Sequence, residues 1–234
     1  MYECNQFTRT ELALGKDGIE KLKNSKIILF GLGGVGSYIA EALARVGVGN
    51  LIIVDGDTVD ITNINRQLIA NINTIGKNKA ELVKERISLI NPLANVVAIS
   101  KFVKSEDDID FIDGTVDYVI DAIDDFDAKI MIIKKAKELG LNLISSMGTA
   151  KRLHGDMFKI ADISKTKVCP LAKKMRRELK KLRINKVKVL YSDEVPTEMH
   201  EIDGYVGKSL GSVSFVPPVA GMLIAGEVVR DLLK

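Results

Sequence analysis

Four glycines stand close together after an apolar run, in the segment Gly31-Leu32-Gly33-Gly34-Val35-Gly36. A G-x-G-x-x-G turn binds phosphate when an apolar strand precedes it and a helix follows, which is the context here. The first glycine permits a tight turn, the second lets the backbone approach a phosphate, and the third lets the helix pack on the strand. Asp55 ends the next apolar run, where a carboxylate binds ribose hydroxyls. The pattern predicts an adenine-nucleotide site, and its first expected ligands are Gly31, Gly33, Gly34, Gly36 and Asp55.

Three amide side chains and one guanidinium follow in the sequence, and they distinguish this site from an ordinary dinucleotide-binding site. Residues 63–67 read Asn-Ile-Asn-Arg-Gln, and Lys79 begins the next helix-period segment. A pyrophosphate is largely satisfied by a glycine turn and a helix N-terminus. Additional fixed cations suit a triphosphate, which carries more charge. The sequence therefore predicts ATP, with further ligands at Asn63, Asn65, Arg66, Gln67 and Lys79.

Two acids, Asp121 and Asp124, end the fourth apolar run. Open α/β sheets bind ligands at the carboxyl ends of their strands, and magnesium favours carboxylate and phosphate oxygens. We expect Asp124 to bind magnesium and Asp121 to contact the nucleotide. The alternative for Asp124 is a cap on the helix that follows, a role compatible with metal binding.

Apolar runs alternate with helix-period segments through the first two thirds of the chain. Strands are expected over 26–30, 51–54, 96–100, 118–122 and 141–145, and helices over 35–46, 78–90 and 127–139. This alternation predicts βαβ units, and near-continuous apolar strands fit a sheet covered on both faces. Later segments read as strands at 157–160 and 187–191 and as helices at 171–182 and 219–233. The expected fold class is α/β: a Rossmann-like, mostly parallel sheet with helices on both faces, extended by antiparallel strands in the C-terminal third.

Length and composition limit the class of protein. The chain has 234 residues, a formal net charge of +3 and 46% hydrophobic residues, which suits one domain with a sizeable core. We expect a single adenylating domain over 1–234, with a nucleotide-binding core at 1–150 and a basic extension with a closing helix at 151–234. Two cysteines, Cys4 and Cys169, are too few for a disulfide framework or a paired zinc site. No apolar stretch reaches the roughly 20 residues of a membrane span. These features predict a cytoplasmic protein without a membrane partner.

A basic segment dominates the charge distribution. Residues 151–188 contain fourteen Lys or Arg and three acids, so the rest of the chain is net acidic. In the helix expected at 171–182 only Glu178 interrupts the cations, and this uncompensated repulsion favours a polyanion partner over a merely solvated face. Phosphate contacts need charge and no base-reading geometry. The expected nucleic-acid contacts are Lys173, Lys174, Arg176, Arg177, Lys180, Lys181 and Arg183.

Together these motifs resemble the ubiquitin-activating-enzyme-like adenylating superfamily, which contains the molybdopterin and thiamine sulfur-carrier activating enzymes. The matching pieces are Gly31–Ser37, Val54–Asp57, Asn63–Gln67, Gly76–Lys79 and Val119–Asp124. The resemblance implies that ATP and magnesium activate a carboxylate by adenylation, with release of pyrophosphate. It places Asp55 and Asp57 in the nucleotide-binding motif, gives the triphosphate to Asn65, Arg66 and Lys79, and gives magnesium to Asp124.

The same resemblance implies a homodimer, because members insert an arginine near the N-terminus into the ATP site of the partner subunit. Arg9 matches that position, and the alternative is an ordinary surface charge. The implied catalytic residues are Arg9, Arg66, Lys79 and Asp124.

Within the superfamily the chain is similar to the tRNA threonylcarbamoyladenosine dehydratases. The segments Phe7–Gly15, Ser145–Ala150, Ile160–Thr166 and Phe215–Gly221 carry this match. Such enzymes use ATP to close the threonyl carboxylate of a modified adenosine beside the anticodon into a ring, with loss of water. The resemblance thus implies tRNA as the polyanion. The chain departs from that pattern at 151–156, which reads Lys-Arg-Leu-His-Gly-Asp instead of Asn-Lys-x-Asp-Pro-Thr, and at Cys169, where relatives often carry Asp.

Two other functions remain open from the sequence. The first is an adenylyltransferase that activates the C-terminus of a small ubiquitin-like sulfur carrier, with a carrier protein or sulfurtransferase as partner. Cys169 would then form a thioester or persulfide, although Pro170 follows directly and favours a helix start. The second is a nonenzymatic nucleotide-sensing scaffold. The basic segment favours the tRNA enzyme, because a carrier offers a short tail in place of a long phosphate track.

Overall fold

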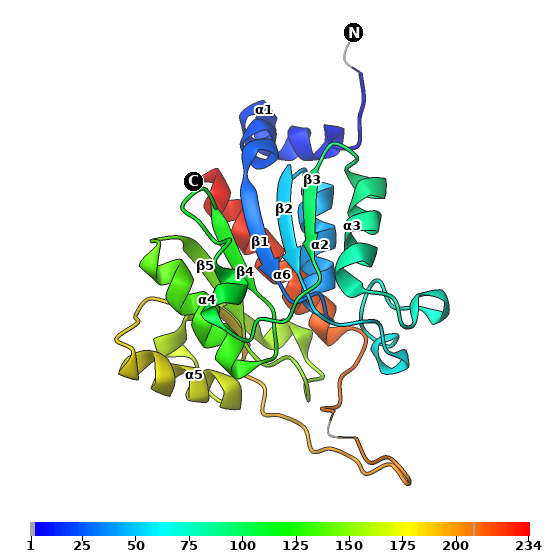
Figure 1. Ribbon diagram of the computed structural model, residues 1–234, viewed down its shortest axis with the longest axis vertical. Coiled ribbons are helices and arrows are strands. Elements are labelled where there is room, and N and C mark those ends of the chain that lie inside the picture. The colour runs from blue at the N-terminus through cyan, green and yellow to red at the C-terminus, as the bar shows by residue number, and fades with distance from the viewer. Residues whose placement is uncertain (1–2, 208) are drawn as a thin grey trace.

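The computed structural model describes residues 3–207 and 209–234 and has one seven-stranded sheet between two layers of helices (Figure 1). The strands are β1 Lys26–Phe30, β2 Asn50–Val54, β3 Asn95–Ile99, β4 Tyr118–Asp121, β5 Asn142–Ser146, β6 Phe158–Asp162 and β7 Lys188–Ser192. The helices are α1 Thr8–Asn24, α2 Gly36–Val46, α3 Lys79–Ile90, α4 Phe126–Glu138, α5 Pro170–Lys181 and α6 Val216–Leu233. Short 3-10 helices are η1 Ile61–Asn63, η2 Ile72–Thr74, η3 Glu106–Ile109, η4 Gly155–Met157 and η5 Ile163–Lys165.

The strand order is β3-β2-β1-β4-β5-β7-β6, and every neighbouring pair is parallel except β6 and β7. Phe30 lies opposite both Val54 and Asp121, so β1, β2 and β4 end at the same edge of the sheet. The expected fold class is confirmed. The C-terminal extension differs in one detail, since β7 continues the parallel sheet and β6 alone runs antiparallel to it.

Alternating side chains of the central strands pack into two separate hydrophobic cores, one on each face of the sheet. Ile27 and Leu29 pack into the core under α2, α3 and α6, whereas Ile28 and Phe30 pack into the core under α4 and α5. This two-sided burial explains the near-continuous apolar runs of the central strands. Gly221 of α6 lies so close to α2 that a Cβ there would come within 2.6 Å of the Val35 carbonyl oxygen. The C-terminal helix therefore packs directly on the helix that the glycine turn begins.

Two helices differ from the sequence expectation. α1 was not predicted: it bends at Gly15, where φ is 76°, and buries little besides Gly18 and Leu22. α6 begins at Val216, three residues earlier than expected. Pro217 and Pro218 fit inside its first turn, because backbone N–H groups there have no intrahelical acceptor. Among the helices of the described residues, none is both long and apolar enough to cross a membrane.

Candidate nucleotide-binding site

A cavity of about 1130 Å³ opens at the carboxyl edge of the sheet, where the strand order reverses between β1 and β4. Such a switch point is where open α/β sheets bind ligands. Segments that follow β1, β2, β3, β4 and β5 all contribute to the lining. Ten residues expected at the nucleotide line it: Gly31, Gly33, Gly34, Asp55, Asp57, Asn63, Arg66, Gln67, Lys79 and Asp124.

Two glycines of the turn are required by close approaches of the backbone. Gly31 has a φ of 83°, and a Cβ there would lie 2.7 Å from the Ala122 carbonyl. A Cβ on Gly36 would lie 1.7 Å from the carbonyl oxygen of Gly31. Gly36 therefore does not line the cavity as a ligand; it lets the first turn of α2 pack against the glycine turn. Gly31, Gly33 and Gly34 are the glycines of the turn that line the cavity.

Asp55 joins the end of β2 to the glycine turn. Its carboxylate accepts hydrogen bonds from the backbone N–H of Leu32, at 2.6 Å, and from that of Asp57, at 2.8 Å. Burial raises the pKa of Asp55, and the two backbone hydrogen bonds oppose that rise. A carboxylate fixed in this way has further lone pairs that can accept from ribose hydroxyls.

The segment after η1 supplies the polar wall of the cavity. Arg66 uses Nη1 to donate to the Thr62 carbonyl and to Asn65 Oδ1, both at 2.9 Å. Gln67 is buried, and its Oε1 has no hydrogen-bond partner within the described part of the chain. Asn63 caps this turn, since its Oδ1 accepts from the Asp60 N–H at 3.2 Å. An unpaired buried amide and a half-bonded guanidinium are groups that a ligand would satisfy.

Asn65 does not line the cavity, which differs from the sequence expectation. Its Nδ2 donates to the Ser212 carbonyl at 2.9 Å and ties this segment to the chain that leads into α6. Ser209, Leu210 and Ser212 of that chain line the cavity beside it. Asn65 thus holds a neighbouring segment at the rim.

Lys79 is held at the cavity edge by the start of α3. Its Nζ lies 2.9 Å from Asp57 Oδ2, and its side chain is only 6% exposed. The Lys79 N–H also donates to the Asp57 carbonyl at 3.0 Å, and Asn78 caps the helix by accepting from Glu81 N–H. A buried ammonium paired with one half-exposed carboxylate keeps donors available for a phosphate.

The two acids after β4 have different surroundings. Asp124 is exposed on the cavity wall and makes no hydrogen bond or ion pair among residues 3–207 and 209–234. Asp125, and not Asp124, caps α4 by accepting from the Ala128 N–H at 2.8 Å. Asp121 is fully buried below the cavity: Lys129 Nζ lies 3.0 and 3.1 Å from its two oxygens, and Ser145 Oγ donates to it. The expectation of a nucleotide contact by Asp121 is corrected, because the Lys129 ammonium and Ser145 occupy its carboxylate.

Sequence reasoning missed the segment after β3. Lys101, Phe102 and Lys104 line the cavity next to Asp55 and Gly56. A Cβ on Gly56 would lie 2.6 Å from the Phe102 ring, so the glycine makes room for that ring, which is 52% exposed. The signal that could have found these residues is their position after a parallel strand, at the same edge as the glycine turn.

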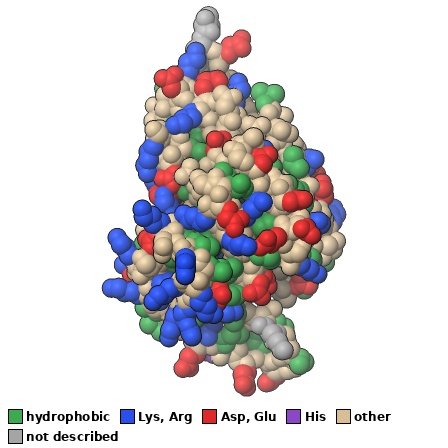
Figure 2. All heavy atoms as spheres, turned by 60° about the vertical axis from the view of Figure 1, so that its left-hand side comes forward, with side chains coloured by type: hydrophobic (Ala, Val, Ile, Leu, Met, Phe, Trp, Pro, Cys, Tyr) green, Lys and Arg blue, Asp and Glu red, His purple; other side chains and the backbone are tan. Residues whose placement is uncertain are grey.

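The basic helix α5 starts at the cavity, since Leu171 lines it, and then runs along the surface. Figure 2 shows Lys and Arg side chains gathered on this side of the molecule. The expected contacts that are exposed are Lys173, Lys174, Arg177, Lys180, Lys181 and Arg183. Arg176 is an exception, because it is half-buried and donates through Nη1 to the Thr166 carbonyl at 2.8 Å. Its guanidinium therefore holds the segment that precedes α5.

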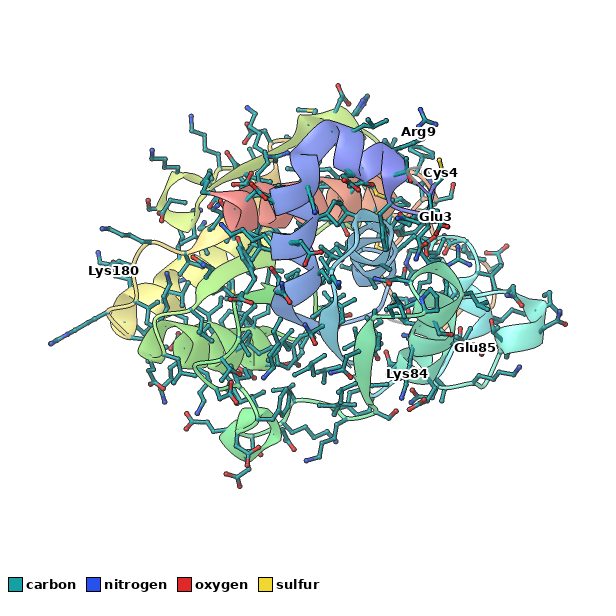
Figure 3. The ribbon with its side chains drawn as sticks, turned by 90° about the horizontal axis from the view of Figure 1, so that it is seen from above. Glu3, Cys4, Arg9, Lys84, Glu85 and Lys180 are labelled. Carbon is teal, nitrogen blue, oxygen red and sulfur yellow. The ribbon has the colours of Figure 1, made fainter. Side chains whose placement is uncertain are left out.

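Neither Arg9 nor Cys169 lines the cavity of its own chain. Arg9 is exposed on α1, at the opposite end of the sheet from the cavity (Figures 1 and 3). Cys169 is 2% exposed and packs in the core below α5, which it precedes. Both cysteines are free thiols.

Comparison with known proteins gives the same assignment over nearly the whole chain. The ThiF family matches residues 7–234. The tRNA threonylcarbamoyladenosine dehydratase of Bacillus subtilis is 47% identical over 242 residues, which cover 98% of this chain and 95% of the relative. The E. coli tRNA N6-threonylcarbamoyladenosine dehydratase in complex with AMP has a TM-score of 0.89 at 30% identity, covering 97% of this chain and 94% of that chain. Its complex with ATP has a TM-score of 0.87 at 28% identity and covers 97% and 93%. The expected resemblance is confirmed: the chain belongs to the ThiF family.

Proposed function

We propose that this protein is an ATP-dependent tRNA threonylcarbamoyladenosine dehydratase. The observation that carries the proposal is the cavity at the carboxyl edge of the sheet, whose lining joins the glycine turn to Asp55, Arg66 and Lys79. A relative of that name aligns over 98% of the chain, and solved structures of another were determined with AMP and with ATP.

The cavity fits ATP in three ways. Gly33 and Gly34 leave backbone N–H groups open to a phosphate, and the start of α2 adds its positive end. Arg66 and Lys79 supply fixed cations for the β- and γ-phosphates. Asp55 would accept from the ribose, and the unpaired Gln67 Oε1 marks a place where a bound group would complete a buried hydrogen bond.

Asp124 is the residue that would hold magnesium. The described residues contain no group of three or more His, Cys, Asp or Glu able to hold a metal ion. One free carboxylate nevertheless fits the ion, because magnesium is often bound through one or two carboxylates together with substrate phosphates and water. When bound, magnesium neutralises charge on the polyphosphate.

The reaction needs an activated carboxylate, because a carboxylate resists nucleophiles and has no good leaving group. A threonyl carboxylate oxygen would bond to the α-phosphorus of ATP as pyrophosphate leaves. The carbamoyl nitrogen of the same nucleoside would then bond to the acyl carbon, lose its proton and expel AMP, which carries away one carboxylate oxygen. The chain positions the reactants and balances the separating charge through Arg66 and Lys79, so no protein nucleophile is required.

We infer a homodimer in which Arg9 completes the ATP site of the partner subunit. Two observations support this inference. Arg9 lies on α1, at the opposite end of the sheet from the cavity of its own chain (Figure 1). It also matches the position of the arginine that superfamily members insert into the partner's ATP site. A tRNA substrate and two free cysteines also support a cytoplasmic location.

The carrier-activating alternative is disfavoured by Cys169. Its sulfur is buried, so a carrier C-terminus could not reach it without rearrangement of the α5 start. The basic surface of α5 also suits a polyphosphate chain better than a protein tail.

The deciding experiment is nucleoside mass spectrometry of tRNA that carries threonylcarbamoyladenosine, after incubation with the protein, magnesium and ATP and isolation at mild pH. We expect the modified nucleoside to lose one water only when ATP is present. The Arg66→Ala variant should be slower by about 100-fold or more. An unchanged nucleoside mass with ATP demonstrably bound would refute the dehydratase, and full turnover by Arg66→Ala would refute the site.

A further inference from the structure

A second cavity, of about 350 Å³, lies between the C-terminal end of α4 and the turn that follows α5. We call it the α4–α5 pocket. Its charged lining residues are Lys134, Lys137, Glu138 and Arg183. It shares no lining residue with the nucleotide cavity.

Two cations of the α4–α5 pocket have no counter-ion within the described residues. Lys134 lies 2.6 Å from Glu106 and 3.9 Å from Glu138, so its charge is balanced. Lys137 donates to the Lys186 carbonyl at 2.8 Å and forms no ion pair there, which leaves further N–H donors. The exposed Arg183 guanidinium is likewise unpaired in this part of the chain. Burial lowers the pKa of Lys137, and the Asp162 carboxylate opposes that shift without forming an ion pair with it.

The backbone of the turn that bears Arg183 adopts a conformation that glycine would adopt with less strain. Arg183 and Lys186 have φ values of 57° and 55°, in the left-handed region that favours glycine. Arg183 ends α5 with hydrogen bonds from its N–H to the Lys180 carbonyl and from the Ile184 N–H to the Leu179 carbonyl. Glycine is the usual residue at this position of a helix end. Arg183 thus places a cation in the pocket lining at a position where glycine would relieve the backbone.

The α4–α5 pocket continues the basic face of α5. The twelve residues of this helix span about 18 Å, from Leu171 at the nucleotide cavity toward Arg183 at the pocket. The exposed cations Arg177, Lys180 and Lys181 lie between these two points along the chain. A polyanion that follows α5 from the cavity thus arrives at the pocket.

We propose that the α4–α5 pocket binds one backbone phosphate of the substrate tRNA, one helix length away from the nucleotide cavity. The proposal rests on the proposed function. The phosphodiester oxygens accept from the Lys137 ammonium and from the Arg183 guanidinium, whose fork matches two oxygens at once. The pocket then sets the register of the RNA along α5.

Arg183→Gly is the sharpest test, because glycine removes the charge and relieves the left-handed backbone. We expect thermal stability to stay equal or rise, while tRNA binds roughly tenfold more weakly at low salt. The slope of log affinity against log salt concentration should fall by about 1. Lys137→Met, which keeps the apolar stem, should give the same loss.

The matched control is Lys84→Met, which removes one exposed cation from α3. Figure 3 shows Lys84 and Lys180 on opposite sides of the molecule. This variant should bind tRNA as the wild type does within about twofold, because its side chain lies on the other side of the molecule from α5 (Figure 3) and is screened by salt. A loss equal to that of Arg183→Gly would mean that net charge alone governs binding, and the pocket would be rejected.

Other outcomes also decide the matter. Unchanged tRNA affinity and salt slope in both Arg183→Gly and Lys137→Met would overturn the proposal. It would also be overturned if inorganic phosphate bound the wild type but not Arg183→Gly while tRNA affinity stayed constant, because the pocket would then serve a free anion. Failure of the proposed function is distinguishable, since it would appear as no water loss by the wild-type protein even where tRNA binds.

Discussion

The polar groups at the two ends of the parallel sheet differ in how completely they are hydrogen-bonded within the protein. At the carboxyl end, Asp124 lacks a partner among the described residues, Arg66 is bonded through one nitrogen, and Gln67 keeps an unpaired oxygen. At the amino end, Lys188 Nζ lies 2.8 Å from Glu227 and also bonds Asp231, while the Tyr118 hydroxyl donates to Asp231 at 2.8 Å.

The difference lies in what each group still lacks. The amino-end network of Tyr118, Lys188, Glu227 and Asp231 is satisfied within the protein, with Arg230 and Lys234 as further donors to Glu227 and Asp231. It raises the pKa of Tyr118, mainly through burial, and holds that of Asp231 at about 2, because its hydrogen-bonding partners outweigh burial. Groups in the cavity are fixed in position but incompletely bonded, which is the arrangement that prepares a site for charge brought by a ligand. Closed networks stabilise the fold, and open ones are available for binding.

The buried pair below the cavity should behave as a closed network despite its location. Replacing Lys129 by Met leaves the Asp121 carboxylate buried without its cation, and we expect a loss of about 3–5 kcal/mol in the free energy of unfolding. Urea denaturation measures this. The double variant Lys129→Met/Asp121→Leu should recover most of the loss, and a double variant as unstable as the single one would contradict the ion-pair explanation.

Lys79 should behave as an open group, with a large effect on catalysis and a small one on stability. We expect Lys79→Met to slow ATP-dependent water loss by about 100-fold or more, because a fixed cation beside the polyphosphate is lost. Lys77→Met is the matched control: this exposed neighbour does not line the cavity, and its rate should match that of the wild type. Equal rates for both variants would place the triphosphate elsewhere.

The amino-end network predicts a pH dependence of stability alone. The folded pKa of Asp231, about 2, lies below its ordinary 3.8, so the carboxylate stabilises the fold above pH 4 and that stabilisation fades as pH falls toward 2. The Asp231→Asn variant lacks this stabilisation at every pH. The difference in free energy of unfolding between the wild type and Asp231→Asn should therefore narrow by about 2 kcal/mol from pH 5 to pH 2. Urea titrations at both pH values test this, with Asp17→Asn, an exposed acid on α1, as control. A gap of constant size would show that Asp231 does not titrate as described.

The sequence predicted the central strands well, because a strand buried on both faces must be apolar along its length. β1 falls on its expected range, and the ends of β2 and β4 differ by one residue. α1 escaped prediction because it buries few side chains and bends at Gly15, so its apolar periodicity is weak.

The lining of the candidate site was predictable where one local motif supplies several lining residues, as in the glycine turn and in Asn63, Arg66 and Gln67. It was not predictable where a tertiary partner decides the role. Lys129, which lies eight residues after Asp121 in the chain, binds the Asp121 carboxylate. Arg176, one of the cations expected to contact tRNA, donates to Thr166 instead. Phe102 reaches the cavity only because β3 ends beside β2.

Because α6 packs on α2, the order in which the chain is synthesised affects how this protein folds. Val216, Ala220, Ile224 and Val228 bury their side chains in the core that α2 shares, and Gly221 sits against Val35 at the base of the glycine turn. During translation, the glycine turn and α2 are made about 170 residues before the helix that covers them. The nascent chain therefore carries an uncovered apolar flank until residues 216–233 emerge from the ribosome. Truncated products should need chaperone shielding, and the nucleotide pocket is among the last parts of the molecule to be completed.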